Sequence, residues 1–493
     1  MQNKTFKKKL NRFFGIVMVV AFVAGITFAT SATTSSSQVI VDGRAYDVPF
    51  EVLDGHVFLV GEDIATLLSG DFTWIAESYS AVLNISGNVF SMSVGDSPTA
   101  TINGEATRFT VHAQVIGDRV FLPLHFITDI QGLDVRHNPH TNTVIISSPE
   151  NQLITIAGVG SHGARDGARA QFNLPNAVFS DLDGNVFVAD TFNNLIRKIC
   201  SDGLTRRHAG DILATDDVGF PHGFMRNGHA LNSALFNRPM DGVLGVQGHI
   251  FIADAENHAI RVINGNQVST LTGGATYGHA DGSLSDALFN FPAAIDVDSS
   301  GNIFVADALN HVIRKISADG QVSTIAGVPE VSGFGNGGGN PNRALFNAPM
   351  GIAVGGGGRI YVADTGNNLI RVIDGTDVYT IAGSVVFPAG PGWDDMPIGD
   401  FADGAYAMFN QPVGIAIWDD AIIVADSANH RIRVVDKATG YTRTLAGSGF
   451  PGYLGGLPTE AELHLPMGVE IVDNNLFIAD TGNNVIRRLT LRE

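Results

Sequence analysis

Six aspartates in this chain each precede an arginine by seven residues, and each aspartate ends a hydrophobic run. A carboxylate and a guanidinium at a fixed spacing could form a charged binding site, or a bond that holds one copy of a motif together. Because a pair present in every copy serves the copy itself, we interpret all six pairs as structural. They are Asp190/Arg197, Asp254/Arg261, Asp307/Arg314, Asp364/Arg371, Asp426/Arg433 and Asp480/Arg487.

A second polar set stands four residues after each of these aspartates: Asn194, His258, His311, Asn368, His430 and Asn484. Histidine can bind metals or respond to pH, but its alternation with asparagine favours a cap on a turn. Equivalent positions of a repeat lie on one face, so the set is also a candidate ligand-binding ring. Metal-ligand spacings such as Cys-x-x-Cys or His-Glu-x-x-His are absent from the sequence, which therefore predicts no metal and no cofactor.

Two long connections, 210–239 and 383–412, carry aromatic residues among acidic ones. Aromatic rings stack on cations and sugars, and carboxylates add hydrogen bonds, so these segments suit a binding surface. The alternative is that the connections fold back and bury their own aromatic residues. The candidates for ligand contact are Phe224, Trp393, Asp394 and Asp395.

The aspartate motif is part of a longer repeat, whose strands must position the polar residues. It reads VADTFNNLIRKI, IADAENHAIRVI, VADALNHVIRKI, VADTGNNLIRVI, VADSANHRIRVV and IADTGNNVIRRL, with an element such as ALFNAP before each copy and one such as STIAG after most. Six copies of these linked elements resemble the NHL repeat family. The resemblance implies a six-bladed β-propeller over residues 149–493.

Each repeat predicts four short strands. The second strand is hydrophobic at consecutive positions, which indicates burial on both faces, as when blades pack against each other. Asp-Gly and Gly-rich pairs, such as Asp183-Gly184 and Asp319-Gly320, supply tight turns. We interpret Asp181/Asp183 and Asp296/Asp298 as side chains that stabilise such turns. The last copy lacks a fourth strand and residues 152–158 form an isolated one, so we expect that segment to close the ring.

Residues 38–148 predict a smaller α+β module in which a short strand runs twice into a helical stretch. The phrases RVFLPLHFITDIQGLDVRHNPHTNTVIIS and MSVGDSPTATINGEATRF resemble the N-terminal, stalk-type domain of copper amine oxidases. Such domains recur in surface and secreted proteins of Gram-positive bacteria. The resemblance implies no copper chemistry, since this domain is not the catalytic one. The fold class is thus mainly β, a propeller preceded by a small α+β domain.

Residues 1–32 predict an export signal, with five basic residues before a short apolar run, and residues 33–37 a polar linker. We therefore expect a secreted protein, possible retention at the cell surface, and no transmembrane segment after signal removal. Removing residues 1–32 changes the formal net charge from −19 to −24. This charge disfavours nucleic acid as a partner. The single cysteine, Cys200, excludes an intramolecular disulfide, and we expect a buried thiol there.

These features favour a non-enzymatic module that binds an extracellular protein, a glycan, a cell-wall component or a small ligand through its loop-rich face. The alternative is a propeller enzyme, a lyase or lactonase-like hydrolase with a metal in the central channel. We expect the first strands to begin at the channel with Asn176, Asp241, Ala293, Gly351, Gly414 and Gly468, of which two are polar. No catalytic residue is predicted.

Overall fold

The computed structural model describes residues 152–491 except 201–202, 212–223, 275 and 385–398, together with the strands, the helix and a few adjoining residues between 38 and 147. The chain divides into two compact units, residues 1–149 and 150–493. The expected export signal and linker lie outside the described residues. Among the described residues, no helix has the length and apolar character needed to cross a membrane.

The first unit contains short strands and one described helix, α2 (Gly61–Leu67). Its core is formed by side chains such as Leu59, Ile64, Leu83 and Leu122, all at most 2% exposed. The strands are β1 (Gln38–Val41), β2 (Arg44–Tyr46), β3 (Phe50–Leu53), β4 (His56–Val60), β5 (Asp71–Ile75), β6 (Ser80–Ile85), β7 (Asn88–Ser93), β8 (Ala100–Ile102), β9 (Glu105–Thr107), β10 (Gln114–Ile116), β11 (Arg119–Pro123), β12 (Asp134–Asn138) and β13 (Thr143–Ser147).

These strands form three described sheets, in the orders β12-β13-β1-β2, β10-β11-β4-β3 and β5-β6-β7-β8-β9. Strands β1 and β13 pair in parallel, so the beginning and the end of the unit lie in one sheet. The first predicted strand and helical stretch correspond to β4 and α2. The second predicted helical stretch lies largely outside the described residues.

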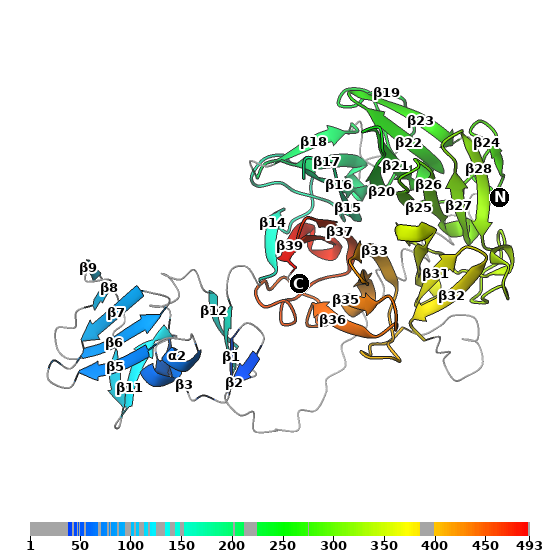
Figure 1. Cartoon of the computed structure of the whole chain (residues 1–493). Helices are drawn as coiled ribbons and strands as arrows, with labels where there is room; N and C mark the ends of the chain where they lie inside the picture. Colours follow the sequence, from blue (N-terminus) through cyan, green and yellow to red (C-terminus); the bar gives the residue numbers. More distant parts are fainter. Residues whose placement is uncertain are drawn as a thin grey trace, which may run out of the picture. The chain divides into compact units, whose positions relative to one another are not determined.

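Over its described residues, the second unit forms six antiparallel sheets in sequence, which we call blades one to six (Figure 1). The mainly β propeller architecture is therefore confirmed. The blades comprise β15 (Ala177–Ser180), β16 (Val186–Asp190), β17 (Leu195–Ile199) and β18 (Thr205–Ala209); β19 (Gly228–His229), β20 (Pro239–Leu244), β21 (Ile250–Asp254), β22 (Ala259–Asn264) and β23 (Gln267–Gly273); β24 (Gly282–Ser283), β25 (Pro292–Val297), β26 (Ile303–Asp307), β27 (Val312–Ile316) and β28 (Gln321–Ala326); β29 (Gly351–Val354), β30 (Ile360–Asp364), β31 (Leu369–Asp374) and β32 (Asp377–Ala382); β33 (Pro412–Trp418), β34 (Ala421–Asp426), β35 (Arg431–Asp436) and β36 (Thr442–Ala446); β37 (Pro466–Val472), β38 (Asn475–Asp480), β39 (Val485–Thr490) and β14 (Ile154–Ala157).

The second strand of each blade is buried along most of its length, as its unbroken apolar sequence predicts. In β30, all five residues from Ile360 to Asp364 are buried, because neighbouring blades cover both faces of the strand. The turns from the first to the second strand and from the third to the fourth strand use glycine with positive φ. Examples are Gly184 at 74° and Gly320 at 85°. Short 3-10 turns, η6 (Pro341–Arg343) and η7 (Gly356–Gly358), lie between strands.

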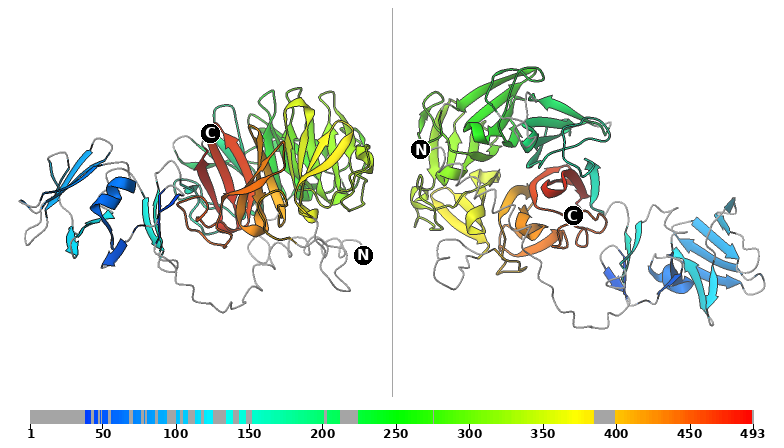
Figure 2. Two further views of the ribbon diagram at one scale, coloured as in Figure 1. Left: turned by 60° about the horizontal axis from the view of Figure 1, so that its bottom comes forward. Right: turned by 180° about the vertical axis from the view of Figure 1, so that it is seen from behind.

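The first strands of the blades form a closed ring. Each first strand contacts the first strands of both neighbouring blades, and Figure 2 shows the blades arranged around a common centre. The first strands are β15, β20, β25, β29, β33 and β37. The two ends of the propeller segment meet in blade six, where β14 pairs with β39 through Ile154 opposite Arg488 and Thr155 opposite Arg487. The predicted closure by residues 152–158 is therefore confirmed, and blade six combines both ends of the repeat array.

Candidate functional site

Each repeated aspartate and arginine form a buried ion pair. The oxygen-to-nitrogen distances run from 2.7 Å for Asp426–Arg433 to 3.2 Å for Asp480–Arg487. All twelve side chains lie at or near zero exposure, so the pairs offer no charge to a ligand. In blade four the other Asp364 oxygen accepts the backbone amide of Asn347 at 2.7 Å, and Arg371 donates to the carbonyl of Leu345 at 3.1 Å. The pair thus joins two strands to the segment that enters the blade.

Each of these arginines binds more groups than its aspartate, and this is clearest in blades one to three. There Arg197, Arg261 and Arg314 are fully buried, and Nη1 of each binds its aspartate at 2.8 Å, 2.8 Å and 2.9 Å. Nη2 of each also reaches a second side chain, in the connection that enters the blade. These partners are Asp166 for Arg197 at 2.7 Å, Asn227 for Arg261 at 3.0 Å and Asp281 for Arg314 at 2.8 Å.

The seven-residue spacing could not reveal these second partners, because they stand 31 to 34 residues before the arginine. Each guanidinium also lies over a phenylalanine ring, with Arg314 4.8 Å from the centroid of Phe289. Arg197, Arg261 and Arg314 are therefore junctions inside the blade, where a planar fork of donors binds several groups at once. None of the three guanidinium groups is accessible to a ligand.

The six Asn and His side chains of the candidate ring each follow a 3-10 turn and have left-handed backbone, with φ between 53° and 59°. We call these turns the ring loops. They lie between the second and third strands of blades one to six: η3 (Thr191–Asn193), η4 (Ala255–Asn257), η5 (Ala308–Asn310), η8 (Thr365–Asn367), η9 (Ser427–Asn429) and η10 (Thr481–Asn483).

Every ring side chain accepts a hydrogen bond from the next blade. The Oδ1 atom of Asn368 accepts the amide of Gln411 at 2.8 Å, and the Nδ1 atom of His311 accepts the amide of Ala348 at 3.0 Å. Asn194, His258, His430 and Asn484 make the equivalent bonds to Arg238, Phe291, Leu465 and Leu174. The acceptor atom of each ring residue is therefore used to join blades, and a ligand-binding role for the ring stays a prediction.

The histidines in this ring are neutral in the folded protein. An Nδ1 atom that accepts a hydrogen bond carries no proton, so the proton of the ring resides on Nε2. Burial lowers the pKa of His258 to about 4, and burial with the nearby His464 and Arg431 lowers the pKa of His430 to about 4. The histidines therefore serve here in the same way as asparagine, and this explains why the two residue types alternate in the sequence.

The connections between blades are anchored to the ring loops. The side-chain amide of Asn310 donates to the carbonyl of Gly278 at 2.8 Å, and that of Asn367 donates to the carbonyl of Gly333. Asn429 and Asn483 bind Asp400 and Gly452 in the same way. An exposed aromatic residue adjoins each of these four carbonyls, and we call the four residues the aromatic rim: Tyr277, Phe334, Phe401 and Tyr453. The equivalent bond of Asn193 to the carbonyl of Gly163 has no such neighbour.

The aromatic rim lies on the same face as the Asn/His ring. The rings of Tyr277 and His258 have centroids 5.7 Å apart. Of the fifteen large hydrophobic side chains exposed in the described part of the propeller, eleven belong to blade connections. Among the predicted contact residues, Phe224 is 55% exposed there, whereas Trp393, Asp394 and Asp395 lie outside the described residues. The loop-rich face thus presents aromatic surface around polar loops.

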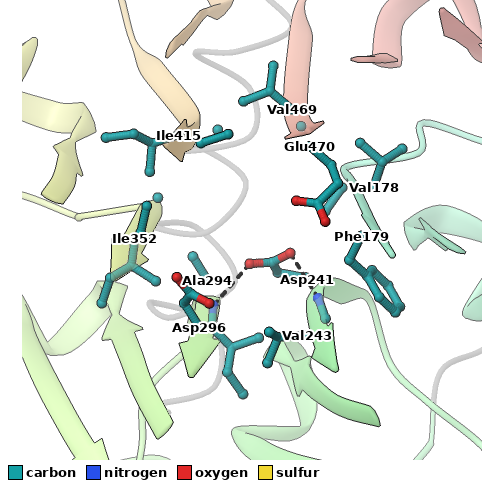
Figure 3. Close-up of a pocket in the computed structure, with 18 of the residues that line it drawn as sticks. Val178, Phe179, Asp241, Val243, Ala294, Asp296, Ile352, Ile415, Val469 and Glu470 are labelled. Carbon is teal, nitrogen blue, oxygen red and sulfur yellow. Dashed lines mark hydrogen bonds between the residues drawn. The ribbon is translucent and has the colours of Figure 1, made fainter. Parts of the chain in front are cut away.

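A second candidate site is the cavity of about 400 Å³ inside the ring of first strands (Figure 3). Its described lining is mostly apolar, with Val178, Ile352, Ile415 and Val469 among the side chains. The same lining contains four carboxylates and no lysine, arginine or histidine: Asp181, Asp241, Asp296 and Glu470.

Three of these carboxylates also join neighbouring blades across the cavity wall. Asp241 accepts the amide of Ile295 at 3.0 Å, and Asp296 accepts the amide of Val354 at 2.6 Å. Glu470 accepts the hydroxyl of Ser180 at 2.6 Å. First strands have no strand beyond them on the cavity side, so the acids satisfy amides that would otherwise lack a partner.

Burial in the cavity disfavours the charged form of these acids. It raises the pKa of Asp241 to about 8, that of Asp296 to about 6 and that of Glu470 to about 7. Backbone hydrogen bonds oppose this effect, whereas the neighbouring carboxylates add to it for Asp241 and Glu470. The three acids therefore share a cavity in which a cation would be favourable and a further anion would not.

The sequence interpretation placed Asp296 in a turn, and this was wrong. Asp296 lies in β25 and faces the cavity, whereas Asp298 does stabilise a turn by accepting the amides of Ser300 and Asn302 at 2.9 Å. Asp181 accepts the amide of Asp183 at 3.1 Å, as predicted. Sequence reasoning also missed Glu470, which stands, like Asp296, four residues after the repeat proline. Side chains alternate between the two faces of a strand, and this alternation after Pro292 and Pro466 was the sequence signal that could have revealed Asp296 and Glu470.

Glycine occupies the second position after the proline in three adjacent blades because the backbones approach closely there. A Cβ on Gly351 would lie 1.9 Å from the carbonyl oxygen of Val413, and one on Gly468 would lie 2.6 Å from the Cα of Ala177. The positions expected to begin the channel are therefore of two kinds: some carry a side chain, and at the glycines the backbones of neighbouring blades come into close contact.

Cys200, expected to be buried, is partly exposed because it lies just beyond the end of β17.

The families that match this chain agree with the fold of each unit. Residues 40–146 match the copper amine oxidase N-terminal domain, residues 230–374 the teneurin NHL domain and residues 409–435 the NHL repeat. The chain therefore carries NHL repeats. The NHL propeller is preceded by the copper amine oxidase N-terminal domain, as the sequence motifs indicate.

Two curated relatives align with the chain. The chain is 29% identical over 299 residues to SUPPRESSOR OF QUENCHING 1 of Arabidopsis thaliana, and 28% identical over 335 residues to NHL repeat-containing protein 2 of Bos taurus. These alignments cover 57% and 50% of the chain. The chain spans only 27% and 45% of the length of these two relatives.

A solved structure supports the fold. An auxiliary nutrient binding protein from Bacteroides thetaiotaomicron superposes with a TM-score of 0.53 at 13% sequence identity, over 92% of this chain and 97% of that one. At this level of identity the likeness concerns the fold alone.

Proposed function

We propose that the NHL propeller is a secreted or cell-surface binding module that takes an extracellular protein, glycan or cell-wall component on its loop-rich face. The observation that carries the proposal is the aromatic rim, Tyr277, Phe334, Phe401 and Tyr453, which adjoins the Asn/His ring. Exposed aromatic side chains supply contact area at low entropic cost and are enriched at binding interfaces. A ring of loops on a closed scaffold keeps this surface in place without ligand.

Two rim residues also contact arginine side chains of the blades, so we do not choose them for substitution. Phe401 lies under the guanidinium of Arg431 at 3.8 Å, and Tyr453 lies 5.5 Å from that of Arg487. Tyr277 and Phe334 are 48% and 47% exposed. Phe224 is 55% exposed on a neighbouring connection. Substitution of these last three residues should leave the fold intact.

The test is co-sedimentation of the full mature protein with purified Gram-positive cell walls. We expect the Phe224→Ala, Tyr277→Ala, Phe334→Ala triple variant to lose sedimentation with an unchanged melting temperature. The matched control is Leu182→Ala, a 94% exposed side chain on the opposite, turn-bearing face, and it should bind normally. Equal sedimentation of the triple variant and the native protein would contradict the proposal, as would a loss shared by the control.

A second candidate function is cation binding in the central cavity, the site that a propeller enzyme would use. The carboxylates of Asp241, Asp296 and Glu470 favour it, since the described lining contains no basic side chain. Within the described residues no three acidic, histidine or cysteine side chains are close enough to hold a metal ion directly. A hydrated or organic cation therefore fits the cavity better than a bare metal.

Elemental analysis of the dialysed mature protein, with melting temperatures in calcium and in chelator, tests this second function. A stoichiometric ion, or a calcium-dependent rise that the Asp296→Asn variant loses, would support it. A metal-free protein whose melting temperature ignores calcium and chelator would refute the metal form of this function.

A further inference from the structure

A groove of about 420 Å³ lies on blade five, where the turn between β33 and β34 meets the turn between β35 and β36. These strand ends are opposite the ring loops, so the groove belongs to the face that the proposed function leaves unused. Blade five is the orange sheet of Figure 1. The lining residues are Trp418, Asp419, Asp420, Ala421, Val434, Asp436, Tyr441 and Arg443.

The two aromatic residues of the groove are specific to blade five. Trp418 is the sixth residue after the repeat proline, and the other blades have Asp181, Gly245, Asp298, Gly355 and Val472 there. Tyr441 precedes the first residue of the fourth strand. The other blades have Leu204, Gln267, Gln321, Asp377 and Gln152 at the positions aligned by strand pairing. A residue needed to build a blade recurs in every blade, so this aromatic pair has another role.

Three polar side chains around the groove make no hydrogen bond with the fold, although the ammonium group of Lys437 interacts electrostatically with two of them, Asp419 and Asp420. Over the described residues, the carboxylates of Asp419 and Asp420 and the guanidinium of Arg443 form no hydrogen bond or ion pair with the protein, and all three residues are exposed. Asp436 differs, because it accepts the amide of Thr439 at 2.7 Å and the hydroxyl of Thr439 at 2.6 Å. Two acceptors and one planar donor thus remain for a ligand.

The turn that carries the two free carboxylates is held in place. The ammonium group of Lys437 donates to the carbonyl of Asp419, and the Lys437 amide donates to the carbonyl of Asp420 at 2.9 Å. One side of Trp418 packs against the core shared by blades five and six. Its ring is therefore fixed, and Tyr441, 55% exposed, completes the wall. A site with fixed aromatic and polar groups binds with little loss of conformational freedom.

We propose that this groove binds a neutral oligosaccharide. Sugar rings present apolar C–H faces that stack on indole and phenol rings. Their hydroxyl groups donate to carboxylates such as those of Asp419 and Asp420, and accept from a guanidinium such as that of Arg443. The adjacent acidic pair disfavours uronic or sulfated sugars by like-charge repulsion. The inference is independent of the aromatic rim, which lies at the other end of the strands.

The test is calorimetric and fluorescence titration of the mature protein with oligosaccharides of cellulose, xylan and chitin, and with oligogalacturonate as the charged comparison. We expect saturable binding of at least one neutral sugar in the micromolar to millimolar range, and none of oligogalacturonate. Tyr441→Ala and Arg443→Gln should each weaken binding by about 10-fold or more, which corresponds to about 1.4 kcal/mol. Tyr379→Ala, at the position of blade four that pairs like Arg443, is the matched control.

Two further variants keep the test decisive. Trp418→Phe retains the stacking ring, so calorimetric binding should persist while the fluorescence response at this position disappears. The Phe224→Ala, Tyr277→Ala, Phe334→Ala variant should bind the sugar normally, which separates this site from the loop-rich face. Absence of binding by all three neutral sugars would overturn the proposal, as would unchanged binding by folded Tyr441→Ala and Arg443→Gln variants.

Discussion

The Nδ1 atom of His430 accepts a hydrogen bond from the backbone amide of Leu465 at 3.1 Å, and this contact joins blade five to blade six. Leu465 has a φ of 48°, a left-handed conformation that costs energy for a residue with a side chain. In blade four, Asn368 makes the same contact to Gln411, whose φ is 52°. The bond thus stabilises an unfavourable backbone conformation at a blade boundary, whichever of the two side chains provides it.

We expect His430→Asn to preserve stability near pH 7 and to reduce its loss in acid. Asn provides an acceptor at the same position, as in three other blades. The folded pKa of His430, about 4, lies below the ordinary value of 6.5. The unfolded chain therefore binds more protons between these values, and the free energy of unfolding falls as pH is lowered through the window. The native protein should lose on the order of 1–2 kcal/mol there relative to the variant, allowing for partial exposure.

Denaturant unfolding at several pH values measures this difference. His430→Ala is the comparison that removes the acceptor, and it should be destabilised at every pH. If His430→Asn shows the same acid dependence as the native protein, the histidine is not the group that titrates.

The buried acids of the central cavity should lower the stability of the protein as pH rises, which is the opposite of the effect expected for His430. Burial raises the pKa of Asp296 from 3.8 to about 6, so the folded protein binds more protons than the unfolded chain between these values. The associated stability is fully present below the unfolded pKa and is lost as pH rises through the folded pKa. Asp296→Asn keeps a carbonyl oxygen for the amide of Val354 and carries no charge. We expect the variant to be more stable than the native protein at pH 7, by on the order of 1 kcal/mol.

Urea titrations from acid to neutral pH check this expectation. Asp183→Asn serves as the control, because it removes a carboxylate on an exposed turn that does not line the cavity. A destabilised Asp296→Asn variant at pH 7 would indicate that the charged form is needed, for example by a cation bound in the cavity.

The buried ion pairs should be intolerant of losing one partner. Arg371→Met leaves the carboxylate of Asp364 buried without its cation, and loss of one partner of such a pair costs about 3–5 kcal/mol. Asn336→Ala removes a 2.7 Å bond to the same arginine nearer the surface and should cost about 1 kcal/mol. Thermal unfolding of both variants gives the comparison, and a smaller effect of Arg371→Met would contradict the structural role.

Ring closure should stabilise the whole propeller. Deletion of residues 149–158 removes β14 and with it Leu153, a fully buried side chain of blade six. We expect a loss of several kcal/mol, since each buried large aliphatic side chain contributes about 1.5–3 kcal/mol. A single shifted calorimetric transition would fit a closed ring. An unchanged melting temperature would show that the pairing of β14 with β39 contributes little.

The candidate site was only partly predictable from sequence. The Asn/His ring could be located because its members recur at a fixed distance from Asp190 and its equivalents. Its contacts could not, since the bond from His430 to Leu465 spans 35 residues and depends on how one blade faces the next. Phe224 was recognised as a loop aromatic, but its exposure, like that of Tyr277, depends on the path of each connection over the blade.

The sequence by itself determined the repeat, the four-strand blades, the turns with positive φ and the closing strand β14, because these follow from local periodicity and from a motif repeated six times. Only the tertiary structure decided that Asp241, Asp296 and Glu470 meet in one cavity, and that Trp418 and Tyr441 share one groove. The three acids come from different blades, whereas Trp418 and Tyr441 come from two turns of one blade. The proximity of the acids is set by the packing of blades around an axis, which no local pattern encodes.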